Sequence, residues 1–271
     1  MELTPIDDST DDRLADYRLL NDQRARRAHE SNEFFIAEGY VSIDRVIDSG
    51  HHLRSVLLTP SRVERFTERA ERIAELGGEI PPIYVVPRDS MADVVGFDLH
   101  RGVVASADRR PLLSVADVAG SSAERIGVLV GLNDAENVGV IARAARAFGI
   151  DALVLDPTCT DPYARRTVRV SMGEILHLPV ARAEHWPDDL GVLHEAGIES
   201  WALTPDASAD DVWALDVPDR VALLLGAEGP GLDAASLAAA SRRVRIPISD
   251  GVDSLNVGHA AAVAFAITGR T

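Results

Sequence analysis

The sequence contains no lysine, a single cysteine and no long apolar run. All 27 of its basic residues are therefore arginines, in a chain of 271 residues. Cys159 cannot form a disulfide within the chain. No stretch of about 18 apolar residues is free of charges and breakers, so no transmembrane helix is expected. Residues 1–8 are neither basic nor apolar in the manner of a secretory signal. We therefore expect a cytoplasmic protein.

The charge of the chain gives conflicting indications about nucleic acid. The formal net charge is −16, and phosphate binding usually needs a basic surface. Several arginines nevertheless cluster, such as Arg165, Arg166 and Arg169. A guanidinium group can bind a phosphate through two parallel hydrogen bonds. Each cluster is thus either a solvated face with acids nearby or a local phosphate-binding patch.

The first part of the chain is expected to form a small α/β domain. Residues 1–12 are acidic and are expected to be a loose tail. Between residues 13 and 106, short apolar runs alternate with segments of helical spacing. Strands are expected at residues 34–37, 55–58, 83–86 and 102–105. Residues 107–124 are rich in Asp, Arg, Ser and Ala, and we interpret them as a linker.

The second domain, residues 125–271, is expected to be an α/β domain with a parallel sheet. It begins with the uninterrupted apolar run 126–130, which is typical of a buried parallel strand. Further strands are expected at residues 152–155, 175–179, 199–203, 220–225 and 243–247. Helices are expected at residues 137–148, 162–170, 188–196, 233–240 and 256–268. The last of these helices has no polar face, so it should be buried on every side, by the fold or by another subunit.

Three polar segments follow strands of this second domain. The first contains Asn137 and Arg143, the second has three glycines around Glu228, and the third contains Ser254 and Asn256. Ligands of parallel α/β sheets bind at the carboxyl ends of the strands. Simpler interpretations also exist, because Asn137 and Ser254 could be helix N-caps and the glycines could form a tight turn. The glycine spacing is not that of a dinucleotide-binding loop.

In this order and at these strand ends, the three segments resemble the motifs of the SpoU (TrmH) family of RNA 2′-O-ribose methyltransferases, within the SPOUT superfamily. The resemblance covers residues 126–268, and residues 35–39 and 100–105 are similar to the family's substrate-binding domain. It implies a SPOUT domain with a deep trefoil knot, S-adenosylmethionine as the cofactor and RNA as the substrate. It also implies a homodimer formed through the C-terminal helix and the 137–148 helix.

The resemblance also assigns roles to individual residues. The implied catalytic residues are Asn137, Arg143, Glu228, Ser254 and Asn256. The implied cofactor-binding residues are Leu225, Gly226, Ala227, Gly231, Ile246, Ile248, Ser254, Leu255 and Asn256. The implied RNA-binding residues are Arg101, Arg143, Arg165 and Arg169. No metal is expected, because no His/Cys cluster has ligand spacing.

Several alternatives remain open at this point. Arg143 could be the base or, since a guanidinium is hard to deprotonate, a group that holds phosphate or stabilises developing charge. His259 is either packed at an interface or in contact with substrate. A separate N-terminal domain favours rRNA over tRNA as the substrate, by analogy. The acidic balance of the chain also suits a non-catalytic RNA-binding or assembly factor with the same fold.

Overall fold

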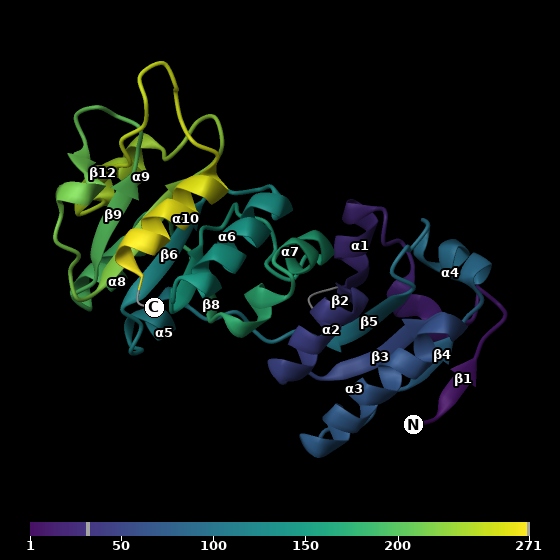
Figure 1. Ribbon diagram of the computed structural model, residues 1–271. Coiled ribbons are helices and arrows are strands. Elements are labelled where there is room, and N and C mark those ends of the chain that lie inside the picture. Colours follow the sequence, from purple (N-terminus) through teal and green to yellow (C-terminus); the bar gives the residue numbers. More distant parts are fainter. Residues whose placement is uncertain (31–32, 270–271) are drawn as a thin grey trace. The chain divides into compact units, whose positions relative to one another are not determined.

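The computed structural model describes residues 1–30 and 33–269, without the side chains of residues 23–25 and 27. The chain divides into two compact units, each with its own sheet (Figure 1). The first unit comprises Met1–Arg110 and Tyr163–Leu176, and the second comprises Pro111–Pro162 and His177–Thr271. A short segment from the middle of the sequence therefore belongs to the first unit.

The first unit is a five-stranded mixed sheet with the order β1-β4-β3-β5-β2. Its strands are β1 (Leu3–Pro5), β2 (Phe34–Glu38), β3 (Leu53–Leu58), β4 (Ile83–Val85) and β5 (Val103–Asp108). Its helices are α1 (Gln23–Glu30), α2 (Gly39–Asp48), α3 (Val63–Glu75), α4 (Arg88–Val95) and α7 (Arg165–Val170), with 3-10 turns at Asp12–Tyr17 and Pro60–Arg62. Only β5 is antiparallel to its neighbours, β3 and β2.

The structure differs from the expected tail and linker. Leu3–Pro5 form an edge strand parallel to β4, and Ile6 is buried and donates its N–H to the Val85 carbonyl at 2.9 Å. The prediction of a loose tail was wrong for these residues, because four uncharged residues suffice for an edge strand beside an acidic segment. The expected linker contains the end of β5 and helix α5 (Val115–Ala119). A capping box formed by Ser114 and Asp117 stabilises the N-terminus of α5.

The second unit contains a seven-stranded sheet in which every strand pair is parallel, with the order β10-β12-β9-β11-β6-β7-β8. The strands are β6 (Arg125–Val130), β7 (Ala152–Leu155), β8 (Val180–Arg182), β9 (Glu199–Leu203), β10 (Asp210–Asp211), β11 (Val221–Gly226) and β12 (Arg242–Arg245). The expected parallel α/β fold is confirmed. The trefoil knot stays a prediction of the resemblance.

One strand that was expected in the second domain is wrong. Residues 175–179 were expected to be a strand, but Glu174–His177 form a 3-10 turn and β8 begins at Val180. The apolar run Ile175-Leu176 is too short for its periodicity to separate a strand from a turn. The strand that does form begins directly after Pro179, which has no N–H to donate to a sheet.

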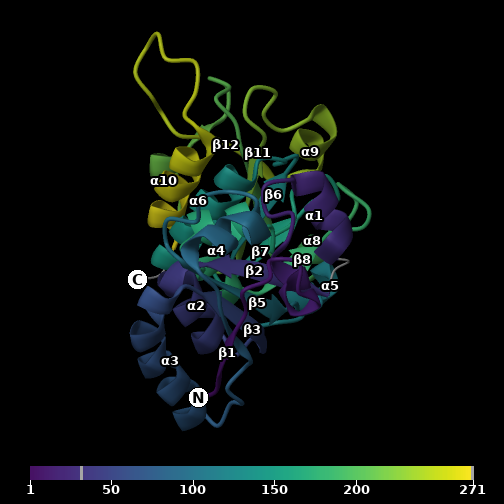
Figure 2. The same cartoon turned by 90° about the vertical axis from the view of Figure 1, so that its right-hand side faces the viewer.

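Helices cover both faces of the parallel sheet. Because side chains alternate along a strand, Ile126, Val128 and Val130 of β6 face a core with α5 and α8 (Leu190–Glu195). Helix α9 (Ala234–Ala239) also packs there through Leu237. On the opposite face, α6 (Ala135–Ala147) and α10 (Val257–Thr268) lie side by side (Figures 1 and 2).

Helix α10 was expected to be buried on every side. Ala261, Ala264 and Phe265 are buried against the unit, whereas His259 and Ala266 are exposed. The fold of a single chain therefore covers one side of this helix and leaves an apolar side uncovered.

Arginine side chains hold this unit together by binding backbone carbonyls. Arg125 is buried and donates to the carbonyls of Thr268 and Asp219, which ties the end of α10 to the start of β6. Arg182 likewise binds the carbonyls of Asp156 and Cys159, and Arg220 binds those of several loop residues. The five N–H donors of a guanidinium suit this role. No helix in the described part of the chain is long and apolar enough to span a membrane.

Candidate active site

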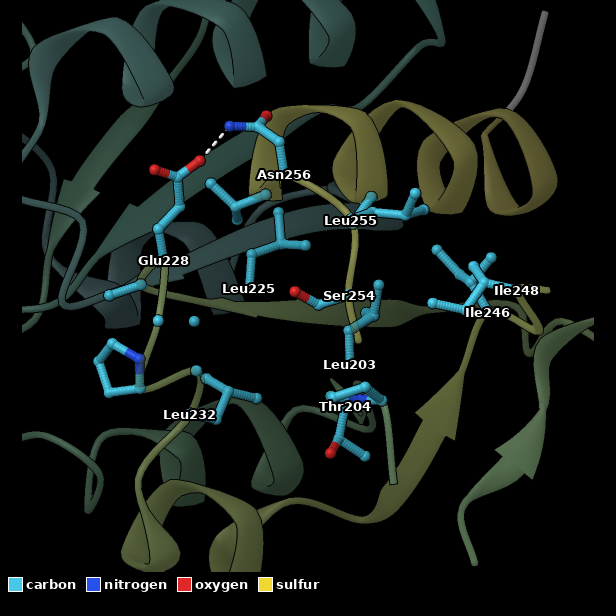
Figure 3. A pocket seen from close by; sticks show the side chains of 18 of the residues that line it. Leu203, Thr204, Leu225, Glu228, Leu232, Ile246, Ile248, Ser254, Leu255 and Asn256 are labelled. Carbon is cyan, nitrogen blue, oxygen red and sulfur yellow. Dashed lines mark hydrogen bonds between the residues drawn. The ribbon is translucent and has the colours of Figure 1, made fainter. Parts of the chain in front are cut away.

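A pocket of about 500 Å³ lies in the second unit, where β11 ends. Its walls come from the end of β11 with the loop 226–232, from the segment 246–257, and from Leu203 at the end of β9 with the following Thr204 and Pro205. Figure 3 shows Glu228 and Asn256 together at one end of the pocket, away from Thr204. The pocket thus occupies the sheet edge at which parallel α/β proteins bind their ligands.

All nine residues that the resemblance assigns to the cofactor line this pocket. They are Leu225, Gly226, Ala227, Gly231, Ile246, Ile248, Ser254, Leu255 and Asn256. Four of them, Leu225, Ile246, Ile248 and Leu255, give the pocket apolar walls, while Gly226 and Gly231 place no side chain between the main chain and the pocket. A concave site with apolar walls and a few polar groups is typical of small-molecule binding.

The loop after β11 depends on a glycine at position 226. A Cβ added there would lie 2.3 Å from both the Gly231 carbonyl carbon and the Leu232 nitrogen. The loop therefore folds back on itself, and the Gly231 N–H donates to the Ala227 carbonyl at 2.9 Å. A side chain at position 226 would prevent this close approach of the two ends of the loop.

The side chain of Asn256 connects the three polar segments. Its Oδ1 caps α10 by accepting the N–H groups of Gly258 at 2.9 Å and His259 at 3.4 Å. Its Nδ2 donates to a carboxylate oxygen of Glu228 and, at 3.4 Å, to Oδ1 of Asn137 (Figure 3 shows the Glu228 bond). One amide therefore stabilises the last helix and holds together residues that are far apart in the sequence.

These contacts settle the simpler interpretations of two residues. Helix α6 is capped by Asp134, whose side chain accepts the Glu136 N–H at 2.9 Å, so Asn137 is not its N-cap. Helix α10 is capped by Asn256, so Ser254 is not a cap and instead lines the pocket. Neither side chain is needed to cap a helix. Asn137 instead accepts a hydrogen bond from Asn256, and Ser254 faces the pocket.

Arg143 stands apart from the other four predicted catalytic residues. It is exposed on α6, does not line the pocket, and makes no hydrogen bond or ion pair with any residue that the structure describes. Its guanidinium is thus available to a partner that the chain itself does not provide.

The remaining predicted RNA-binding residues lie together in the first unit. Arg165 donates to the Glu38 carboxylate at 2.6 Å, Arg169 lies 3.6 Å from the same oxygen, and Arg101 donates to the Glu38 carbonyl at 3.4 Å. Arg165 and Arg169 were expected in the second domain, but their helix α7 packs on β2 of the first unit.

Sequence reasoning missed two features of these sites. Leu203, Thr204 and Pro205 line the pocket because β9 is parallel to β11 and ends at the same edge, which the expected strand at 199–203 could have indicated. The contact between Glu38 and Arg165 was not predicted, because these residues are 127 positions apart in the sequence.

Other chemistries find little support in the structure. Cys159 is buried, and this burial raises the pKa of its thiol to about 12, so it is a poor nucleophile. Among residues 1–30 and 33–269, no three His, Cys, Asp or Glu side chains are grouped in a way that could hold a metal ion.

Comparison with known proteins identifies the family. The sequence model of the SpoU rRNA Methylase family matches residues 125–266. The chain is 42% identical over 269 residues to an uncharacterized tRNA/rRNA methyltransferase of Mycobacterium tuberculosis, which covers 98% of this chain and 91% of that protein. It is 27% identical over 222 residues to the 23S rRNA (guanosine-2′-O-)-methyltransferase RlmB of Ralstonia nicotianae, covering 79% and 87% of the two chains.

A solved structure agrees over nearly the whole length. The AdoMet-bound rRNA methyltransferase from Sinorhizobium meliloti superposes with a TM-score of 0.81 at 26% identity, covering 98% of this chain and 97% of that one. The chain therefore belongs to the SpoU rRNA methylase family, which confirms the family that the sequence motifs indicated.

The double role of Asn256 leads to a prediction about stability. Replacing Asn256 with alanine removes the cap of α10 and should lower the free energy of unfolding by about 1 kcal/mol. Asn256→Ser keeps an acceptor for the cap but removes the amide donor to Glu228 and Asn137. Urea denaturation should therefore show the serine variant within a few tenths of a kcal/mol of the wild type. If both variants lost the same free energy of unfolding, the role of Asn256 as the N-cap of α10 would be contradicted.

Proposed function

We propose that this protein transfers a methyl group from S-adenosylmethionine to a ribose 2′-hydroxyl of RNA, with ribosomal RNA the favoured substrate over tRNA. The observation that carries the proposal is the link from Asn256 to Glu228 and Asn137 at the end of a pocket lined by all nine expected cofactor residues. The names of relatives such as the guanosine-2′-O-methyltransferase support the ribose as the acceptor.

The pocket fits S-adenosylmethionine in size and in chemistry. Its volume of about 500 Å³ suits a ligand of this size. Leu225, Ile246 and Leu255 offer apolar surface to an adenine ring, and the turn at Gly226 offers main-chain hydrogen bonds. When bound, the cofactor supplies a methyl group activated by a sulfonium. Ser254 would hold the polar end of the ligand or the incoming ribose.

The chain's own residues orient the acceptor and balance its charge. Glu228 and Asn137 fix the Asn256 amide, and this preorganised network would position the ribose hydroxyl. A solvated guanidinium stays protonated near neutral pH. Arg143 would therefore act as a cation that holds an RNA phosphate and stabilises the negative charge that develops on the 2′-oxygen, rather than as a base. The O–CH3 bond would form as the S–CH3 bond breaks, and the 2′-hydroxyl proton would leave to water.

This proposal predicts the effect of removing Arg143. Arg143→Ala should lower the rate of methyl transfer to RNA at least about 100-fold, the usual cost of losing a group that stabilises developing charge. Cofactor binding should be unchanged, because Arg143 does not line the pocket. Arg146→Ala, on the same helix, is the control and should retain activity.

The measurement is incorporation of labelled methyl groups into ribosomal RNA and into tRNA. Alkaline hydrolysis then identifies the acceptor, because a 2′-O-methyl group protects the adjacent phosphodiester bond. If the alkali-resistant dinucleotides carried no label, the ribose 2′-hydroxyl would be excluded as the methyl acceptor. Biological function that survives in Arg143→Ala would favour the alternative, a non-catalytic RNA-binding or assembly factor.

We further propose that the protein is a homodimer formed through α10 and α6. The uncovered side of α10 carries Ala262, Val263 and Ala266, and Val140 of the adjacent α6 is 40% exposed. Burial of such a surface against a second copy would be favourable by the hydrophobic effect. It would also meet the expectation that a helix without a polar face is covered on all sides.

The dimer can be tested with a charge on its surface. Ala266→Arg should convert a dimer into a monomer in sedimentation equilibrium, because the guanidinium would be buried without a partner. Ala235→Arg, at an exposed position of α9, is the matched control and should not change the mass. A wild-type protein that is monomeric at micromolar concentration would contradict the proposal.

A further inference from the structure

One end of the first unit's sheet gathers four arginines from three separate parts of the chain. Glu38 at the end of β2 pairs with Val104 of β5, and Leu58 at the end of β3 pairs with Val103, so these strand ends are adjacent. The loops that follow or precede them carry Arg62 and Arg101. Helix α7 packs on β2 and adds Arg165 and Arg169.

Glu38 holds three of these arginines in place. Its side chain is only 7% exposed, and one of its carboxylate oxygens lies 2.6 Å from Nη1 of Arg165 and 3.6 Å from Nη1 of Arg169. Its main-chain carbonyl accepts Nη1 of Arg101 at 3.4 Å. Three cations thus contact one residue that carries a single negative charge, which leaves a surplus of positive charge at this position in an acidic protein.

Close packing against glycine backbone fixes the positions of Arg62 and Arg101. Gly39 has a φ of +81°, and a Cβ added there would lie 2.6 Å from Cδ of Arg101. A Cβ added at Gly102 would lie 3.3 Å from Nε of Arg62. These two arginines therefore flank Gly102, and the four arginines form one continuous group, which we call the Glu38 cluster.

The Glu38 cluster has binding capacity that the chain does not use. Nε of Arg62 is buried and has no hydrogen-bond partner in the part of the chain that the structure describes. Neither Arg62 nor Arg101 forms an ion pair with any described carboxylate, and the side chain of Arg169 is 44% exposed. Arg165 is held from a second side by the ring of Phe97, with a cation–π distance of 5.0 Å.

A purely structural set of salt bridges does not account for this arrangement. Such a set would balance its charges, whereas one carboxylate here faces two guanidinium groups and a third binds the main-chain carbonyl of the same residue. Guanidinium groups held in fixed positions match the oxygens of a phosphate, which can accept several parallel N–H bonds. A phosphodiester backbone supplies such groups at regular intervals and is recognised independently of base sequence.

We propose that Glu38 is a positioning residue that holds Arg101, Arg165 and Arg169, which together with Arg62 form a phosphate-binding site for the RNA backbone. This inference rests on the proposed function and deepens it, because it adds Arg62 and a role for a buried acid to the RNA contacts that the resemblance implies. The carboxylate does not touch the RNA. It holds Arg165 and Arg169 where the phosphates can reach them.

Removing the carboxylate separates positioning from net charge. Glu38→Gln makes the protein more positive by one unit, so binding governed by net charge alone would become tighter. If Glu38 positions the arginines, the affinity for RNA should instead fall about fivefold. Glu75→Gln at the far end of α3 makes the same change in charge at an exposed position and is the matched control.

The measurement is the binding of a fluorescein-labelled RNA stem-loop at several salt concentrations. Each lost phosphate contact should reduce the slope of log affinity against log salt by about 0.7–0.9. Arg62→Gln and Arg101→Gln should each show this reduction, whereas Arg72→Gln, which removes a cation paired with Asp48, should not.

The melting temperature and the affinity for the cofactor are measured for every variant, so that a variant that does not fold is recognised. If Glu38→Gln does not melt as the wild type does, Arg62→Gln and Arg101→Gln decide the question, because neither arginine has a carboxylate partner among the described residues. Tighter or equal binding by a folded Glu38→Gln, or unchanged salt slopes in the two arginine variants, would overturn the inference. A wild type that binds cofactor but no RNA would overturn the RNA substrate itself.

Discussion

The parallel pairing of β6 with β11 is the interaction on which the candidate active site depends. Val130 and Gly226, the last residues of these strands, are paired in register although 96 positions separate them. The loops that follow therefore start at the same edge, and a Cβ at Gly131 would lie 3.5 Å from Cβ of Ala227. Parallel strands require long connections, so residues at one edge come from distant parts of the sequence.

The same edge joins the stability of the fold to its chemistry. Asn256 caps the helix that packs beside α6 and also binds Glu228 and Asn137, so the last helix cannot shift without moving the site. Arg125 fixes the other end of this helix to β6 through the Thr268 carbonyl. Both ends of α10 are thus held by side chains that bind backbone groups which would otherwise lack partners.

The distribution of arginines explains how an acidic chain can bind RNA. Arg125, Arg182 and Arg220 are occupied with backbone carbonyls and add little to a basic surface. The Glu38 cluster and Arg143 carry guanidinium groups with unused donors. The chain as a whole has a net charge of −16, but the Glu38 cluster and Arg143, where phosphate is expected to bind, are locally basic.

Much of the second unit could be predicted from the sequence, because buried parallel strands are apolar runs with polar residues directly after them. The pocket residues follow from this rule, and Thr204 would have followed from it too. The choice of Asn256 over Ser254 as the cap of α10 depends on where the loop ends, which propensities do not determine. The association of α7 with the first unit depends on contacts such as Arg165 with Glu38, for which a six-residue helix gives no local signal. The edge strand β1 was missed because its neighbours are acidic.

The central claim is that the turn at Gly226 forms a pocket for S-adenosylmethionine, and calorimetric titration with this cofactor tests it most directly. The wild type should bind one equivalent per chain. Gly226→Ala should not bind measurably, because its methyl group would force the turn open. Gly191→Ala, whose added Cβ meets no atom within 4 Å, should bind as the wild type does. Equal binding by all three proteins would show that the cofactor site lies elsewhere, and no binding by the wild type would contradict the proposed enzyme.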